Sequence, residues 1–210
     1  MGRSKDKKAI AIAKYLQRRF VGMGYVVHRY DAFSTGSIYL KIDYGVGGSI
    51  RIADHAGKKH LNYRFNILTD EDGAGVSSTT DGVCDRHFYK AESAERLLND
   101  VIKFRDGRVN KYGGTQGYTS IMNKAKEENR GSKGFWMNAR EIKISRAELV
   151  KDWLLRNEIT YEEMDIIVEN LKRNNEKLAD TLRNTKDGWR GLTDKLLDLV
   201  VIRYKEMKQA

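Results

Sequence analysis

Six side chains suited to metal binding or proton transfer fall in two short segments of the chain. The first segment holds Asp54, His55 and His60, and the second holds Cys84, Asp85 and His87. If the two segments met, a histidine beside a carboxylate would provide an acid and a base for phosphodiester cleavage. This pattern leaves open a nuclease that uses His55 or His87 with Asp54 or Asp85.

The same residues also fit a plain structural role. An Asp followed by a His, as at positions 54 and 55, suits a strand end where the carboxylate bonds nearby backbone amides. The spacings HxxxxH and CxxH lack the tight ligand pairs of structural zinc motifs. Phosphate-binding motifs of the GxGxxG or GKS type are also missing from the sequence. We therefore predict no metal and no cofactor, and catalysis is the alternative.

A second set of polar side chains recurs with a period of two, which is the repeat of a β-strand. The set comprises Tyr39, Lys41, Arg51, Asn62, Arg64 and Asn66. Their apolar neighbours would face the core, so these residues would share the other face of a sheet. There, cations would meet phosphates, amides would bond sugars or base edges, and Tyr39 would stack on a base. Such residues are equally ordinary on a solvated sheet face.

Cations and aromatic rings are interleaved over residues 103–140, where 9 basic residues outnumber 3 acidic ones. This glycine-rich segment predicts RNA binding, because unpaired bases stack on aromatic rings and phosphates attract cations. The predicted contacts are Lys111, Tyr112, Tyr118, Lys124, Lys126, Arg130, Lys133, Trp136 and Arg140. The alternative is a surface insertion whose aromatic rings dock on the core.

The charge of the chain points to the same part of the sequence. Lys and Arg total 39 against 29 Asp and Glu, and residues 141–210 hold 14 of each kind. The whole excess therefore precedes residue 141, as expected for a protein that binds a polyanion. A single cysteine and the lack of a long apolar run fit a cytoplasmic protein with no disulfide and no membrane segment.

Hydrophobic periodicity predicts the elements that would position these residues. We expect helices over residues 4–21, 93–107 and 119–130, strands over residues 25–30, 38–43, 49–53, 61–67 and 86–90, and a loop over residues 111–118. Ser145 with Glu148 and Thr160 with Glu163 form capping boxes for two later helices. The second of these helices would reach Leu178, and a final helix would begin at Thr193.

These elements predict an α+β fold with an antiparallel four- or five-stranded sheet flanked by helices, followed by a helical C-terminal region. The expected domains are an α+β sheet domain over residues 1–107, a basic glycine-rich connecting segment over residues 108–140, and the helical region over residues 141–210.

Three phrases within residues 37–68, SIYLKID, GSIRIADHAGKKH and LNYRFNI, resemble a recurring pattern in small basic proteins of phages and other mobile elements. In that pattern an Ile-Tyr-x-Lys strand precedes Ile-Arg-Ile-(Ala or Ser)-Asp-His and a basic aromatic strand. Some proteins of that kind inhibit bacterial defence, including anti-CRISPR proteins. The resemblance implies a phage or mobile-element origin and evasion of host defence by blocking guide RNA loading or target access.

Together these observations predict non-catalytic binding of nucleic acid, with RNA favoured, or of an RNA-guided nucleoprotein complex. A nuclease is one alternative. The other is a protein–protein interaction module that uses the C-terminal helices, which would also join copies of the chain into a homo-oligomer.

Overall fold

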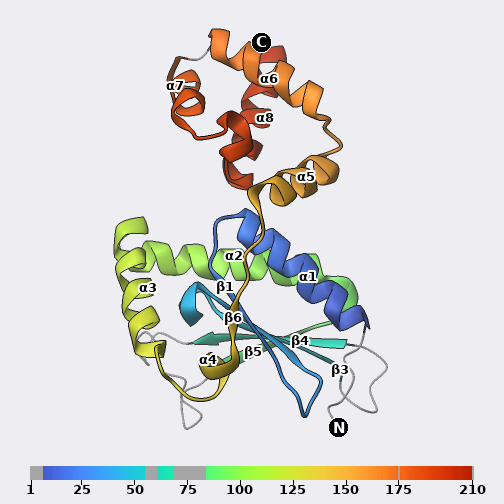
Figure 1. The fold of residues 1–210 in the computed structure, drawn as a ribbon, viewed down its shortest axis with the longest axis vertical. Coiled ribbons are helices and arrows are strands. Elements are labelled where there is room, and N and C mark those ends of the chain that lie inside the picture. The colour runs from blue at the N-terminus through green and yellow to red at the C-terminus, as the bar shows by residue number, and fades with distance from the viewer. Residues whose placement is uncertain (1–6, 55–60, 69–83, 175, 210) are drawn as a thin grey trace. The chain divides into compact units, whose positions relative to one another are not determined.

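The computed structural model describes residues 7–54, 61–68, 84–174 and 176–209 (Figure 1). The chain divides into two compact units, each with its own core. The sheet unit comprises Met1–Gln17 and Tyr25–Ile142, and the helical unit comprises Arg18–Gly24 and Lys143–Ala210. Among the helices of the described residues, none has both the length and the apolar character that crossing a membrane requires.

The sheet unit is built on one antiparallel sheet with the strand order β5-β4-β3-β2-β1-β6. Its strands are β1 (Val27–Asp31), β2 (Ile38–Ile42), β3 (Ser49–Asp54), β4 (Leu61–Leu68), β5 (Cys84–Tyr89) and β6 (Arg140–Glu141). The first five correspond to the five predicted strands, and the α+β class is confirmed. The two-residue strand β6 was not predicted, because a pair of residues is too short to show a period.

One face of the sheet is apolar and covered by helices. Ile38, Leu40 and Ile42 of β2 are fully buried, as are Ile50 and Ile52 of β3. Helices α1 (Lys7–Gly22) and α2 (Ala94–Lys111) supply the rest of this core through Ile12, Leu16, Leu97, Leu98 and Val101 (Figure 1). Burying each such side chain contributes about 1.5–3 kcal/mol, which holds the sheet against the helices.

Two predictions about the end of α2 and the residues that follow it were wrong. The helix does not end at Gly107 but continues to Lys111, because Gly107 is exposed and a helix tolerates one glycine at a cost of about 1 kcal/mol. The actual break is at Gly113 and Gly114, which have φ angles of 77° and 95°. Residues 111–118 are consequently not one loop, since α3 begins within them and spans Thr115–Asn129.

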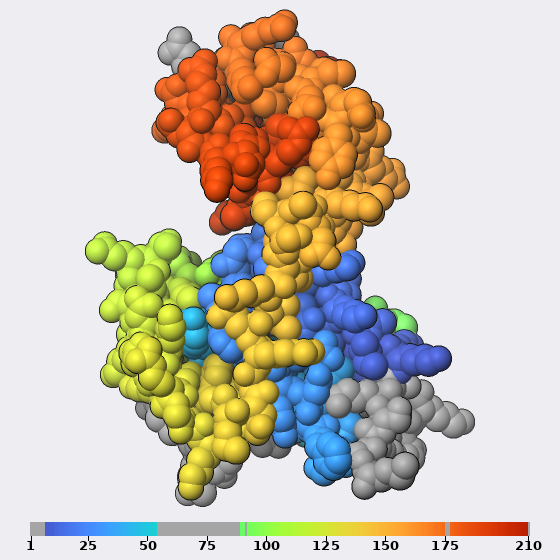
Figure 2. All heavy atoms as spheres, in the orientation of Figure 1, coloured from blue at the N-terminus to red at the C-terminus, as the bar shows by residue number. Residues whose placement is uncertain are grey.

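The rest of that segment returns to the sheet. After α3 comes the four-residue helix α4 (Phe135–Asn138), which contacts β1 and leads into β6. In Figure 2 the atoms of this segment, in yellow, lie beside the blue atoms of the first strands. The residues predicted to form a basic connector therefore build two helices and an edge strand of the sheet unit.

The helical unit contains α5 (Arg146–Asn157), α6 (Tyr161–Asn174), α7 (Glu176–Asn184) and α8 (Asp194–Gln209). Both predicted capping boxes are confirmed, by hydrogen bonds between Ser145 and Glu148 and between Thr160 and Glu163. The predicted helix from Thr160 to Leu178 is divided between α6 and α7. Its apolar residues share one core with Trp153, Trp189, Leu197 and Val200.

Candidate nucleic-acid interface

The second face of the sheet carries a row of four residues on successive strands. Tyr30 pairs with Tyr39, Tyr39 with Arg51, and Arg51 with Arg64. Because adjacent strands lie about 4.8 Å apart, this row spans about 14 Å. We call these residues the Tyr–Arg row. The register thus brings three predicted contacts into line and adds Tyr30; for Arg64 the structure describes only the backbone position.

The described side chains of the Tyr–Arg row form a platform with its outer side partly open. The rings of Tyr30 and Tyr39 are stacked, with centroids 5.9 Å apart and planes inclined by 22°. The guanidinium carbon of Arg51 lies 5.8 Å from the centroid of the Tyr39 ring. Its Nε and one terminal nitrogen donate to Ser37 Oγ over 3.2 and 3.1 Å, which holds the charge beside the rings. Aromatic faces with an adjacent guanidinium can bind unpaired bases and phosphates.

A second row on the same face is covered instead of open. Its register is His28, Lys41, Ser49 and Asn66. Lys41 Nζ lies 4.9 Å from the ring centroids of both Phe135 and Trp136. Burial there lowers the pKa of Lys41 below its ordinary value. Lys41 therefore stabilises α4 on the sheet through cation–π contacts, in place of the predicted open phosphate contact.

Trp136 also packs on this second row. Its ring meets the His28 ring edge-on, with centroids 5.2 Å apart, while Phe135 meets Tyr30 at 6.0 Å. The aromatic rings of α4 thus dock on the sheet, as the alternative interpretation of the 103–140 segment predicts. Phe135 nevertheless extends the aromatic surface of the Tyr–Arg row through its contact with Tyr30.

Tyr118 does not belong to the interface, and its prediction as a contact is corrected. Its side chain is 1% exposed, and its hydroxyl donates to Asp43 Oδ2 over 2.9 Å. Burial raises the pKa of Tyr118 far above its ordinary value, so the hydroxyl keeps its proton. Arg105 Nε donates to the same carboxylate oxygen over 2.5 Å and lies over the Tyr25 ring. A ring enclosed in this way cannot stack on a base.

Tyr112 is likewise turned toward the interior of the sheet unit. It is half-buried against the cluster of Val46, Tyr118 and Ala125, and its hydroxyl accepts a hydrogen bond of 2.8 Å from an Arg108 terminal nitrogen. Its ring centroid lies 6.4 Å from that of Tyr118. The aromatic residues of the 103–140 segment thus divide between the interior and α4, and the open platform comes from the sheet.

The predicted cations of this segment lie on the surface, and several are neighbours of acidic groups. Lys111, Lys124, Lys126, Arg130, Lys133 and Arg140 are all exposed. Lys124 lies 3.8 Å from Glu128, and Arg130 lies 3.1 Å from Glu127. Exposed pairs of this kind are worth about 0–1 kcal/mol, so these cations can exchange their partners for a phosphate.

A cleft adjoins the Tyr–Arg row at the β1–β6 edge. It has a volume of about 400 Å³ and is lined by Arg29, Tyr30, Asp31, Phe33, Asn138 and Arg140. Arg29 Nε donates to Asp31 Oδ1 over 2.9 Å, whereas Phe33 is 71% exposed. The cleft shares Tyr30 with the platform, so the two form one continuous surface. Asn138 and Arg140 reach it only because α4 returns the chain to the sheet.

The described residues of the two segments of possible acid, base and metal ligands lie at different ends of the sheet. Asp54 pairs with Leu61 and Asp85 pairs with Ile67, at opposite ends of β4. Six residues of strand separate these positions by about 20 Å. The register therefore keeps Asp54 and Asp85 out of one shared site, and the nuclease alternative would have to draw its acid and base from within one segment.

Other residues of that set are only partly covered by the structure. His55 and His60 lie outside the described residues, and for Cys84, Asp85 and His87 only the backbone is described. Within the described part of the chain, no group of three or more His, Cys, Asp or Glu side chains is arranged to hold a metal ion.

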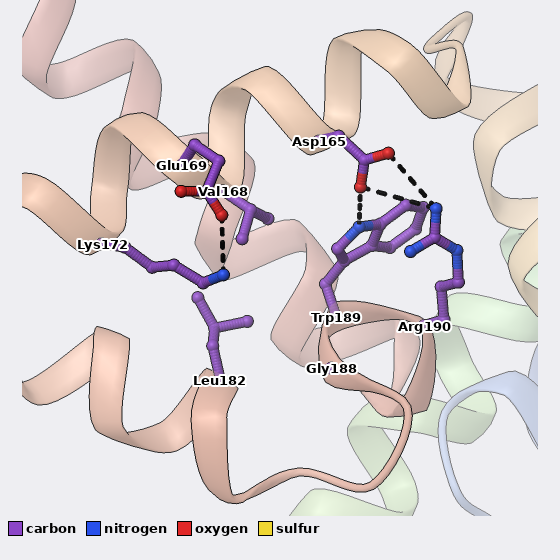
Figure 3. A pocket seen from close by; sticks show the side chains of 8 residues that line it. All are labelled: Asp165, Val168, Glu169, Lys172, Leu182, Gly188, Trp189 and Arg190. Carbon is purple, nitrogen blue, oxygen red and sulfur yellow. Dashed lines mark hydrogen bonds and ion pairs between the residues drawn. The ribbon is translucent and has the colours of Figure 1, made fainter.

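A smaller cavity of about 240 Å³ lies in the helical unit (Figure 3). The polar side chains that line this cavity are hydrogen-bonded to one another. Asp165 accepts from Trp189 Nε1 over 2.6 Å and from Arg190 over 3.3 Å, and Lys172 donates to Glu169 over 2.7 Å. Val168 and Leu182 supply apolar walls. With its polar groups paired to one another, this cavity is better explained by helix packing than by ligand binding.

The geometry therefore favours the Tyr–Arg row and its adjoining cleft as the candidate site. No protein-family model, curated protein or solved structure matches the chain.

Proposed function

We propose that the sheet unit binds single-stranded nucleic acid, with RNA favoured, through the Tyr–Arg row. The observation that carries this proposal is the register that aligns Tyr30, Tyr39, Arg51 and Arg64 across four neighbouring strands. Aromatic residues on adjacent strands of an open sheet face give unpaired bases a surface on which to stack. Arginines at the end of the same row supply charge for the phosphates.

The strand must be unpaired, because the bases of a duplex are already stacked on each other and show only their edges in the grooves. A length of about 14 Å accommodates two to three nucleotides on the platform itself. Exposed Arg140 lies at the other end of the surface, beside Tyr30 and the cleft. The bound strand would therefore run across the sheet with a cation near each end.

The proposal is for binding without cleavage. Its support is the separation of Asp54 from Asp85 along β4, which keeps these two carboxylates out of one shared site. The resemblance of residues 37–68 to phage and mobile-element proteins suggests the setting. In a counter-defence role, the bound strand would be a guide RNA, and its capture would block guide loading or target access.

The test is a fluorescence anisotropy titration of a labelled single-stranded RNA of about twelve nucleotides and mixed sequence. Loss of base stacking costs about 1–3 kcal/mol per base, so the double variant Tyr39→Ala, Arg51→Ala should bind at least about tenfold more weakly. Full-length RNA recovered after the titration agrees with binding alone, whereas shortened RNA supports the nuclease.

The helical unit offers a matched control. There Arg190 lies 5.7 Å from the ring of exposed Tyr161, which is nearly the Arg51–Tyr39 distance. The double variant Tyr161→Ala, Arg190→Ala removes the same residue types and should bind RNA like the parent. Equal binding by the parent and the Tyr39, Arg51 variant would rule out the sheet face as the site.

A further inference from the structure

The outward face of α8 carries an apolar pair between two opposite charges. Counted along the helix, Lys195, Leu199, Ile202 and Glu206 follow the spacing i, i+4, i+7 and i+11, which keeps them on one line of an α-helix. Leu197 and Val200 face the core of the helical unit and are buried. The line of four is on the opposite side, where Leu199 is 52% and Ile202 is 51% exposed.

We infer that this line is the contact between two copies of the chain, in which two α8 helices pair in antiparallel orientation. A two-fold axis between positions 199 and 202 places Leu199 against Ile202 of the second copy. The same axis places Lys195 against Glu206, once at each end of the contact. The line of four residues is thus complementary to itself, with an apolar centre and an ion pair at each end.

The flanking charges also suit this pairing. In an antiparallel pair, exposed Asp198 on one side of the line comes opposite exposed Lys205 of the second copy. On the other side, half-exposed Leu196 comes beside the aliphatic stem of Arg203. A parallel pair would instead set Lys195 against Lys195 and Glu206 against Glu206, which is unfavourable for both charges. Charge therefore selects the antiparallel arrangement.

The contact is short, and its length sets its strength. The line from position 195 to position 206 covers about 17 Å of helix, so it buries less area than a permanent dimer requires. Glu206 also has a competing partner, because Arg203 donates to it over 2.5 Å on its own helix. The dimer is accordingly weak, and it forms at high concentration or where a bound nucleic acid gathers several copies.

Sedimentation velocity of the full chain over about 10–500 μM tests this inference. The parent should shift toward dimer with concentration. Lys195→Glu sets two pairs of glutamates against each other and should weaken dimerisation about tenfold. The double variant Lys195→Glu, Glu206→Lys restores both pairs and should recover the parent's behaviour. Both changes suit the helix dipole, so the fold of the monomer is retained.

Rescue by the double variant separates this interface from any other. A parent that stays monomeric at about 500 μM would overturn the inference. Dimerisation that Lys195→Glu does not weaken, or that the double variant does not recover, would overturn it as well. Leu199→Gln provides an independent check, because it removes half of the apolar centre and should leave the protein monomeric at every concentration.

Discussion

Asp43 links three parts of the sheet unit through one buried carboxylate. Its backbone lies at a φ of 50°, immediately after β2, and its side chain is 1% exposed. The carboxylate accepts hydrogen bonds from the Val26 amide, Arg105 Nε and the Tyr118 hydroxyl. These bonds fix α2 and α3 against the strand that carries Tyr39, so the open face of the sheet depends on this interior contact.

We therefore predict that Asp43→Ala lowers the free energy of unfolding by about 3–5 kcal/mol, because it leaves the partly buried Arg105 without its partner. Tyr118→Phe removes one hydrogen bond and should cost about 1–2 kcal/mol. Urea denaturation measures both. Asp187→Ala is the matched control, since Asp187 also has a positive φ but makes no capping bond with its side chain. Equal losses at the two aspartates would contradict this role for Asp43.

His28 makes the stability of the sheet unit depend on pH. Burial beside Tyr44 and Trp136 lowers its pKa below the ordinary value of 6.5, with Glu141 opposing the shift. The unfolded chain therefore takes up the proton at a higher pH than the folded protein. Stability from this residue is present above about pH 6.5 and is lost as the pH falls through the lowered value.

Urea denaturation at about pH 7.5 and about pH 5 tests this prediction. The parent should lose stability on acidification, and His28→Gln should lose less, because glutamine does not titrate in this range. An identical loss in parent and variant would assign the pH dependence to other groups.

At the scale of elements, the rings of Phe135 and Trp136 hold α4 to the sheet. None of its four residues is fully buried, yet Phe135 and Trp136 enclose Lys41 and contact Tyr30 and His28. We predict that Trp136→Ala releases α4 and β6, since the helix is too short to persist alone. Hydrogen exchange should accelerate over residues 135–142 and stay slow over β2. Uniform acceleration over both would instead indicate global unfolding.

Residue alternation was sufficient to predict the sheet but not the elements that border it. Ile38, Leu40, Ile42, Ile50 and Ile52 mark β2 and β3 clearly, because one buried face imposes a period of two. The α2 boundary was missed because Gly107 is tolerated within the helix. Strand β6 was missed because its two residues join the sheet only through the packing of α4, which is a tertiary contact without a local signal.

The candidate site shows the same limit. Tyr39, Arg51 and Arg64 could be assigned to one face from their spacing alone. The environment of the residues beside that row could not be predicted from spacing. Spacing gives no sign that Tyr118 turns inward to Asp43, or that Lys41 is covered by α4. Strand alternation placed Lys41 on the polar face, and neighbouring cations in the sequence made Tyr118 look available, but both side chains are covered in the fold.

For the whole molecule, the uneven charge predicts how binding responds to salt. The net charge of +10 lies entirely before residue 141, and each phosphate contact contributes a slope of about −0.7 in log K against log salt for a single strand. Arg51→Ala should therefore make the slope shallower by about 0.7. Tyr39→Ala should weaken binding by a similar factor at every salt concentration, because stacking releases no counterions. Identical slopes for the parent and Arg51→Ala would contradict phosphate contact at this residue.

The most direct test of the central claim is ultraviolet crosslinking of the full chain to a single-stranded RNA that contains photoreactive uridine, followed by mass spectrometry of the peptides. Stacking on the Tyr–Arg row predicts nucleotide adducts at Tyr30 or Tyr39, and their loss when excess unlabelled RNA competes. Adducts confined to residues 143–209, or adducts that competitor RNA does not reduce, would contradict binding at the sheet face.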